Sequence, residues 1–176
     1  MDIKTPTLSA VLALALAACG AAETPAADTV SAAPAATPAA SAPRQTDERP
    51  LLVVHKTPWC GCCTAWAEQA EAAGFAIELR DHEDLVPVKQ ALGVPFSQAS
   101  CHTTEVEGLF VEGHVPFEQV HRLLAERPEG VLGIAVPGMP LGSPGMEADV
   151  QHAYSVNLVH ADGRIEAWAH YPKDAP

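Results

Sequence analysis

The sequence predicts one α/β domain with the element order β-α-β-α-β-β-α, followed by a Gly/Pro/Met-rich loop and a β-hairpin. Short apolar runs alternate with helical patterns over residues 51–127. Gly or Pro stands at most of the expected boundaries between these elements. Near the C-terminus, Asp162-Gly163 separates two strand-like segments, which is a strong hairpin signal.

The first half of the domain is expected to contain a strand, a helix, a strand and a helix. The four segments are residues 51–55, 64–73, 75–79 and 83–92. The first is apolar and rich in β-branched residues, as in a buried strand. In the second, apolar side chains recur at helical spacing and Gly74 is a natural end. Pro87 is tolerated only near the start of the second helix, and Gly93 ends it.

The second half is expected to continue with two strands and a helix. The segments are residues 100–106, 109–111 and 116–127, and Glu107-Gly108 predicts a hairpin between the strands. Pro116 suits the first helical position. Residues 131–147 are too rich in Gly and Pro for regular structure. The C-terminal hairpin is expected to pair residues 154–160 with 164–171.

Three thiols, Cys60, Cys62 and Cys63, lie between the first strand and the first helix. Core packing does not require three cysteines within four positions. Thiolates select Cu(I), Zn or iron–sulfur clusters, and at a helix N-terminus they are redox nucleophiles of low pKa. A third thiol is useful to a metal site, whereas in a simple exchanger it invites mispairing. Metal ligation is therefore favoured, and thiol–disulfide exchange between Cys60 and Cys63 is the alternative.

The element order, with a cysteine motif after the first strand, resembles the thioredoxin fold. Residues 59–63, Trp-Cys-Gly-Cys-Cys, resemble the Trp-Cys-Gly-Pro-Cys site of thioredoxins, with Cys62 in place of the proline. In that fold a Val-Pro before the third strand is commonly cis, and Pro95 is the candidate here. The third strand runs beside the first, which would bring Cys101 within reach of the motif. A buried strand cysteine is the alternative interpretation of Cys101.

Four further side chains are candidate ligands. His102 would face away from Cys101 on a regular strand, so it is a ligand only if the strand ends or bulges there. His114 stands at a strand-to-helix turn, where it could be a ligand or a cap. Met139 and Met146 lie in Gly-Met contexts of the irregular segment. Their thioethers suit Cu(I), and filling gaps in the packing is the alternative.

The N-terminal third is expected to lie outside the fold. Residues 1–18 predict a signal peptide whose apolar run is too short to span a bilayer. Residues 16–19, Leu-Ala-Ala-Cys, resemble a bacterial lipoprotein box that leaves Cys19 as a lipidated N-terminus. An ordinary secretory signal is the alternative. Residues 19–49, mostly Ala, Pro, Ser and Thr, predict a disordered tether, and residues 50–172 the folded domain.

Composition narrows the possible functions. The formal net charge of −12 argues against a nucleic-acid partner, since phosphate binding depends on Lys and Arg. Five cysteines are an odd number, so at least one lies outside intramolecular disulfides. We find no Ser/His/Asp arrangement and no phosphate loop, and we assign no catalytic residue.

Six motifs resemble the CopG-type periplasmic copper resistance family. They are Lys56-Thr57-Pro58-Trp59-Cys60-Gly61-Cys62-Cys63, Leu92-Gly93-Val94-Pro95, Ser100-Cys101-His102-Thr103, Val111-Glu112-Gly113-His114-Val115-Pro116, Val136-Pro137-Gly138-Met139-Pro140 and Gly142-Ser143-Pro144-Gly145-Met146-Glu147. The resemblance implies a thioredoxin-like fold and copper bound at a cysteine-bridged multinuclear cluster. The four thiols that align with the family's are Cys60, Cys62, Cys63 and Cys101. The side chains that stand in family motifs are His102, His114, Met139 and Met146.

The resemblance also implies copper handling in the cell envelope, with interconversion of Cu(I) and Cu(II). Copper donor, acceptor or efflux proteins of the envelope are the expected partners. The lipoprotein box and tether depart from what we expect of every family member and imply attachment to a membrane. Gly20, and not Asp, follows Cys19, which favours the outer membrane over the inner. The alternatives are a tethered thiol–disulfide oxidoreductase and a copper oxidase.

Overall fold

A computed structural model describes residues 49–173 of the chain. The expected signal peptide, the lipidation site Cys19 and the tether up to residue 48 lie outside the described residues. Within the described part, none of the helices combines the length and the apolar character needed to cross a membrane.

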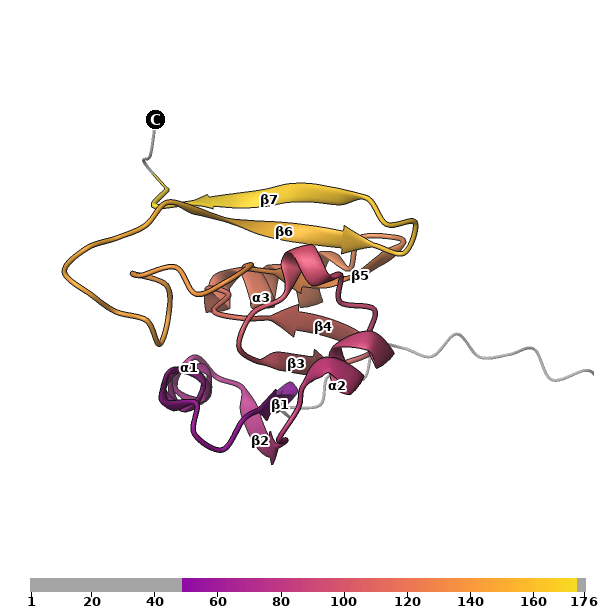
Figure 1. Ribbon diagram of the computed structural model, residues 1–176. Coiled ribbons are helices and arrows are strands. Elements are labelled where there is room, and N and C mark those ends of the chain that lie inside the picture. Colours follow the sequence, from indigo (N-terminus) through magenta and orange to yellow (C-terminus); the bar gives the residue numbers. More distant parts are fainter. Residues whose placement is uncertain (1–48, 174–176) are drawn as a thin grey trace, which may run out of the picture. The chain divides into compact units, whose positions relative to one another are not determined.

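The described chain forms a mixed α/β fold around one sheet with the strand order β2-β1-β3-β4-β5-β6-β7 (Figure 1). The strands are β1 (Leu51–Lys56), β2 (Ala76–Asp81), β3 (Thr103–Val106), β4 (Leu109–Glu112), β5 (Val131–Ala135), β6 (Tyr154–His160) and β7 (Ile165–Tyr171). The helices are α1 (Gly61–Ala72), α2 (Val86–Ala91) and α3 (Phe117–Glu126), with a 3-10 turn, η1 (Phe96–Gln98). The pairs β1–β2 and β4–β5 are parallel, and the other neighbours are antiparallel.

The core lies mainly on the face of the sheet that α1 and α3 cover. Trp66 and Ala70 of α1 and Leu123 of α3 pack with alternate residues of the strands, among them Leu52 and Ile134. The Trp66 ring is fully buried, and its Nε1 donates a hydrogen bond of 3.0 Å to the Val115 carbonyl. Burial of one such side chain contributes roughly 2–3 kcal/mol.

A second, smaller apolar cluster lies on the opposite face. Phe110, Ala135 and Val159 pack there with Leu92 and Val94, which follow α2. Odd and even positions of the central strands therefore face different layers, as the two-residue period of a strand requires.

The predicted α/β class is confirmed, and the C-terminal hairpin is present. One segment was predicted wrongly: residues 131–135 form β5 and not irregular structure. The five-residue run gains its hydrogen bonds from β4 and β6, which are distant in sequence, so local propensity did not reveal it. The cis peptide bond of the described residues precedes Pro172, and the bond before Pro95 is trans.

The strand pairings place one end of each of four strands, β1, β3, β4 and β5, on the same side of the sheet. His55, near the end of β1, pairs with Thr103 at the start of β3, and Thr103 pairs with Glu112 at the end of β4. Glu112 in turn pairs with Ala135 at the end of β5. The segments that follow β1, precede β3 and follow β4 and β5 therefore start from neighbouring positions.

Gly133 in β5 packs so closely against β4 that no side chain fits at this position. A Cβ at this position would overlap the backbone carbonyl and the ring of Phe110. We expect Gly133→Ala to lower the free energy of unfolding by about 2–3 kcal/mol in urea titrations. Gly61→Ala is the matched control, because a Cβ there meets nothing within 4 Å. Equal stability of the two variants would contradict the observed β4–β5 packing.

Candidate metal centre

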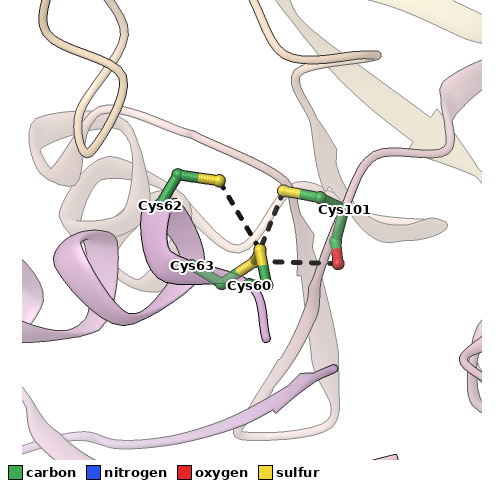
Figure 2. Close-up of side chains that lie close together, drawn as sticks. All are labelled: Cys60, Cys62, Cys63 and Cys101. Carbon is green, nitrogen blue, oxygen red and sulfur yellow. Dashed lines mark hydrogen bonds between the residues drawn. A yellow bond between two sulfur atoms is a disulfide. The ribbon is translucent and has the colours of Figure 1, made fainter. Parts of the chain in front are cut away.

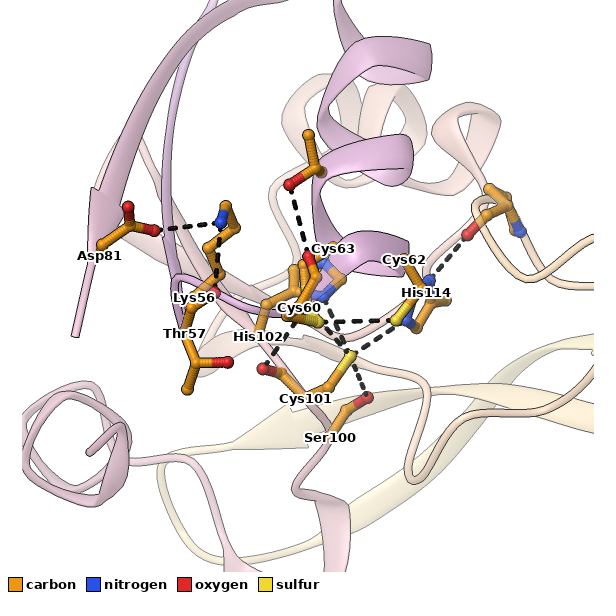
Figure 3. Close-up of a disulfide and its surroundings, with 12 residues drawn as sticks. Lys56, Thr57, Cys60, Cys62, Cys63, Asp81, Ser100, Cys101, His102 and His114 are labelled. Atoms are coloured by element: carbon orange, nitrogen blue, oxygen red, sulfur yellow. Dashed lines mark hydrogen bonds and ion pairs between the residues drawn. A yellow bond between two sulfur atoms is a disulfide. The ribbon is translucent and has the colours of Figure 1, made fainter. Parts of the chain in front are cut away.

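The first turn of α1 holds the three clustered cysteines. Cys60 is the N-cap residue, and Cys62 and Cys63 lie in the first turn of the helix. A disulfide joins Cys60 to Cys63 (Figure 3). Cys62 is a free, half-buried thiol, and Cys63 is fully buried. The free N–H groups of a helix start favour negatively charged sulfur at these positions.

Cys101 completes a group of four sulfurs (Figure 2). Its Sγ lies 3.5 Å from Cys63 Sγ, and Cys62 Sγ lies 3.5 Å from Cys60 Sγ. All four sulfurs lie within 4.8 Å of one another, so the group could hold a metal ion. Cys101 reaches this position because β3 starts at Thr103 and not at residue 100 as predicted, which leaves Cys101 and His102 in the preceding loop.

Two histidines extend the site on the other side of Cys101. His114 Nε2 lies 3.0 Å and His102 Nδ1 3.5 Å from Cys101 Sγ. Both rings are fully buried and lie edge to face, with ring centroids 5.0 Å apart. Cys101, His102 and His114 form a second group whose ligand atoms lie within 4.8 Å of one another. Because Cys101 belongs to both groups, one sulfur connects a thiolate site to an imidazole site.

The hydrogen bonds of His114 assign its tautomer. Its Nδ1 lies 2.7 Å from the Pro144 carbonyl oxygen, which can only accept. Nδ1 therefore carries the hydrogen, and the lone pair of Nε2 faces the Cys101 sulfur. His102 Nε2 is buried without a hydrogen-bond partner among the described residues. An unpartnered buried nitrogen is costly, and the nitrogen of His102 that faces Cys101 is the other one, Nδ1.

Burial governs the protonation of this site. It raises the pKa of the Cys101 thiol to about 12, and the nearby Cys62 thiolate acts in the same direction. Burial also holds the pKa of His102 well below its usual range, with smaller effects from His114 and Lys89. The pKa of His114 is lowered by burial too, although the Pro144 carbonyl opposes the shift. At neutral pH the apo site thus holds a Cys101 thiol beside neutral imidazoles.

The loop after β5 lies against the cysteine helix and carries both candidate methionines. Ser100 Oγ donates to the Gly138 carbonyl, next to the half-exposed Met139. A Cβ at Gly145 would lie 2.7 Å from the Cys62 carbonyl oxygen, so the backbone beside Met146 touches the first turn of α1. The structure thus places both methionines next to segments of the site.

A buried ion pair beneath Cys101 was missed by the sequence analysis. The Glu112 side chain is fully buried and pairs with Lys89 of α2. It also accepts hydrogen bonds from the Ser100 N–H and the Thr103 hydroxyl, which lie on either side of Cys101 and His102. The only sequence signal is a charged residue at the end of an otherwise apolar strand, Leu109–Glu112.

The fold and the site define an α/β protein with a cysteine- and histidine-lined centre that could bind a metal ion. The family model described as "Protein of unknown function, DUF411" matches residues 98–146. A comparison with curated proteins found no relative.

Two solved structures of a copper resistance protein, copG in Form 2 and Form 1, are similar to the chain. Each is 44% identical and matches 71% of this chain, with TM-scores of 0.68 and 0.67. The matches cover 100% and 99% of those proteins. The chain therefore belongs to the CopG copper resistance protein family.

The Glu112–Lys89 pair gives a stability prediction. Glu112→Gln leaves the Lys89 ammonium, whose side chain is largely shielded from solvent, without its counter-charge. We expect a loss of about 3 kcal/mol in the free energy of unfolding, measured by urea titration. The double variant Lys89→Met/Glu112→Gln removes both charges and should lose less than the single variant. The single variant Lys89→Met completes the comparison. If the double variant loses as much unfolding free energy as the two single variants together, the charges are not coupled.

The buried histidines give a pH dependence. Their folded-state pKa values lie below those of the unfolded chain, so the unfolded state binds more protons as the pH falls from 7 to 5. The metal-free chain should therefore lose stability over this range, by up to about 1.4 kcal/mol per pH unit and histidine. His102→Gln should flatten the slope in urea titrations, and His170→Gln at an exposed position should not. An unchanged slope in His102→Gln would contradict this assignment.

Proposed function

We propose that this protein binds copper in the bacterial cell envelope and serves copper resistance or homeostasis. The observation that carries the proposal is the group of four sulfurs that shares Cys101 with two buried imidazoles. Thiolate and imidazole donors suit copper, and thiolates favour Cu(I). The 44% identity to copper resistance proteins supports the same metal.

The site is proposed to hold more than one ion. Cys60, Cys62, Cys63 and Cys101 would hold Cu(I) as thiolates, and Cys101 would bridge to a second ion at His102 and His114. Met139 and Met146 would supply thioethers from the adjacent loop. Because the Cys101 thiol must lose its proton to bind, copper binding releases protons and weakens as the pH falls. Reduction of the Cys60–Cys63 disulfide must precede use of all four thiols.

The fold is proposed to be thioredoxin-like, with the C-terminal strands as an extension. This is supported by the parallel pair β1–β2 around α1, the antiparallel β3 and β4, and the following α3. Lipidation of Cys19 would attach the domain to the outer membrane, facing the periplasm. A flexible tether of the length of residues 19–49 spans roughly 30 Å on average.

Exchange with other proteins of the envelope is part of the proposal. Trp59, which is 68% exposed, and Met139, which is 52% exposed, stand next to segments of the site. Exposed apolar side chains of this kind are suited to contact a copper donor, acceptor or efflux protein. Interconversion of Cu(I) and Cu(II) would fit a site that combines thiolates with imidazoles, since imidazole also serves Cu(II).

A second candidate function is thiol–disulfide exchange with other proteins. The Cys60–Cys63 disulfide at the start of α1 supports it, because low-pKa exchangers use this position. In that case Cys60 would be the nucleophile and copper would not be required.

Cys62→Ser separates the two functions. The full chain, reduced and loaded with Cu(I) without oxygen, should bind more than one copper per chain by metal analysis. Cys62→Ser should lose most of that copper, because it removes a sulfur from the group, whereas exchange through Cys60 and Cys63 should survive. Cys19→Ser is the matched control and should bind as much copper as the unchanged chain. Full copper retention in Cys62→Ser would contradict the proposed cluster.

A further inference from the structure

The four sulfurs form a compact group in which each sulfur of the disulfide has a free thiol beside it (Figure 2). Cys62 contacts the Cys60 end at 3.5 Å, and Cys101 contacts the Cys63 end at 3.5 Å. Thiol–disulfide exchange begins when a thiolate attacks a neighbouring disulfide sulfur. Both free thiols are close enough to a disulfide sulfur for such an attack.

Cys101 has a proton acceptor in place. His114 Nε2 lies 3.0 Å from its sulfur with the lone pair directed at it, and the Pro144 carbonyl holds the opposite ring nitrogen (Figure 3). A nucleophile, a base and a group that orients the base are the parts of an activated nucleophile. Cys62 has no histidine nitrogen within hydrogen-bond distance in the described part of the chain. Burial opposes the loss of the Cys101 proton, but the adjacent imidazole gives this proton an acceptor that Cys62 lacks. On this geometry we assign the attack to Cys101.

We propose that Cys101 attacks Cys63 Sγ and moves the disulfide from Cys60–Cys63 to Cys63–Cys101. The S–H proton of Cys101 passes to His114 Nε2. The Cys63–Cys101 bond forms as the Cys60–Cys63 bond breaks, and Cys60 leaves as a thiolate that takes up the proton. The number of disulfides and the number of electrons are unchanged, so the step needs neither an oxidant nor a reductant.

The new disulfide isomer presents a different pair of thiols. The bond would then join the buried Cys63 to Cys101, and Cys60 and Cys62 would both be free at the start of α1. Two half-buried thiols at a helix N-terminus form a soft dithiol that could bind one Cu(I) ion. This consequence rests on the proposed copper function. It means that the oxidised protein accepts one ion before any partner reduces it.

Alkylation of the oxidised full chain tests the exchange. Iodoacetamide, added without reductant, can label Cys60 only after the disulfide has moved. We expect peptide mapping to find labelled Cys60 together with a Cys63–Cys101 cross-link. Cys101→Ser should abolish both. His114→Ala should slow the labelling of Cys60 about 100-fold, because it removes the base. His170→Ala is the matched control at an exposed histidine and should label at the unchanged rate.

Three outcomes would overturn the proposal. They are absence of the Cys63–Cys101 cross-link, labelling of Cys60 that persists in Cys101→Ser, and a Cys60–Cys62 cross-link, which would make Cys62 the attacking thiol. One equivalent of Cu(I), added without oxygen, should increase the fraction with the Cys63–Cys101 bond. An unchanged fraction would overturn the dithiol site. Copper binding by the reduced chain is measured in parallel, so failure of the copper function is seen separately from failure of the exchange.

Discussion

The antiparallel pairing of β3 between β1 and β4 is the constraint on which the site depends. It places the loop before β3 next to the turn after β1, so that Cys101 meets Cys63 across 38 residues of sequence. The same pairing places His114, two residues after β4, beside Cys101. A shift of this register by one residue would exchange the two faces of β3, and the sulfur group would be lost.

Burial and electrostatics give the sulfurs different properties. Cys62 is accessible at the start of a helix, whereas Cys101 lies beside two neutral imidazoles and above a buried ion pair. The carboxylate of Glu112 holds the backbone on both sides of the Cys101 loop. The candidate site therefore combines a rigidly held thiol with a more accessible one.

The segment from residue 136 to residue 147 closes the site although it has almost no regular structure. Its glycines adopt positive φ angles at residues 138, 142 and 145, and at Gly145 the backbone touches α1 where a side chain would not fit. The Pro144 carbonyl orients His114. The Gly and Pro composition that excluded regular structure is therefore also what allows the close approach to the cysteines.

The sequence by itself determined most of the element types, the cysteine motif at a helix start and the soft character of the candidate ligands. These are local properties, since the periodicity of residues 51–73 and the spacing of Cys60, Cys62 and Cys63 are contained within short segments. Resemblance to a copper resistance family also came from short motifs, and the comparisons confirmed it.

Only the tertiary structure decided the rest. It showed that residues 131–135 form a strand, that the third strand begins at Thr103 and so leaves Cys101 in the preceding loop, and that His102 and His114 both lie beside the Cys101 sulfur. It also revealed the Lys89–Glu112 pair and the thiols at both ends of the disulfide. Each of these features joins residues far apart in the chain. They depend on strand register and burial, which the pattern of a single segment does not contain.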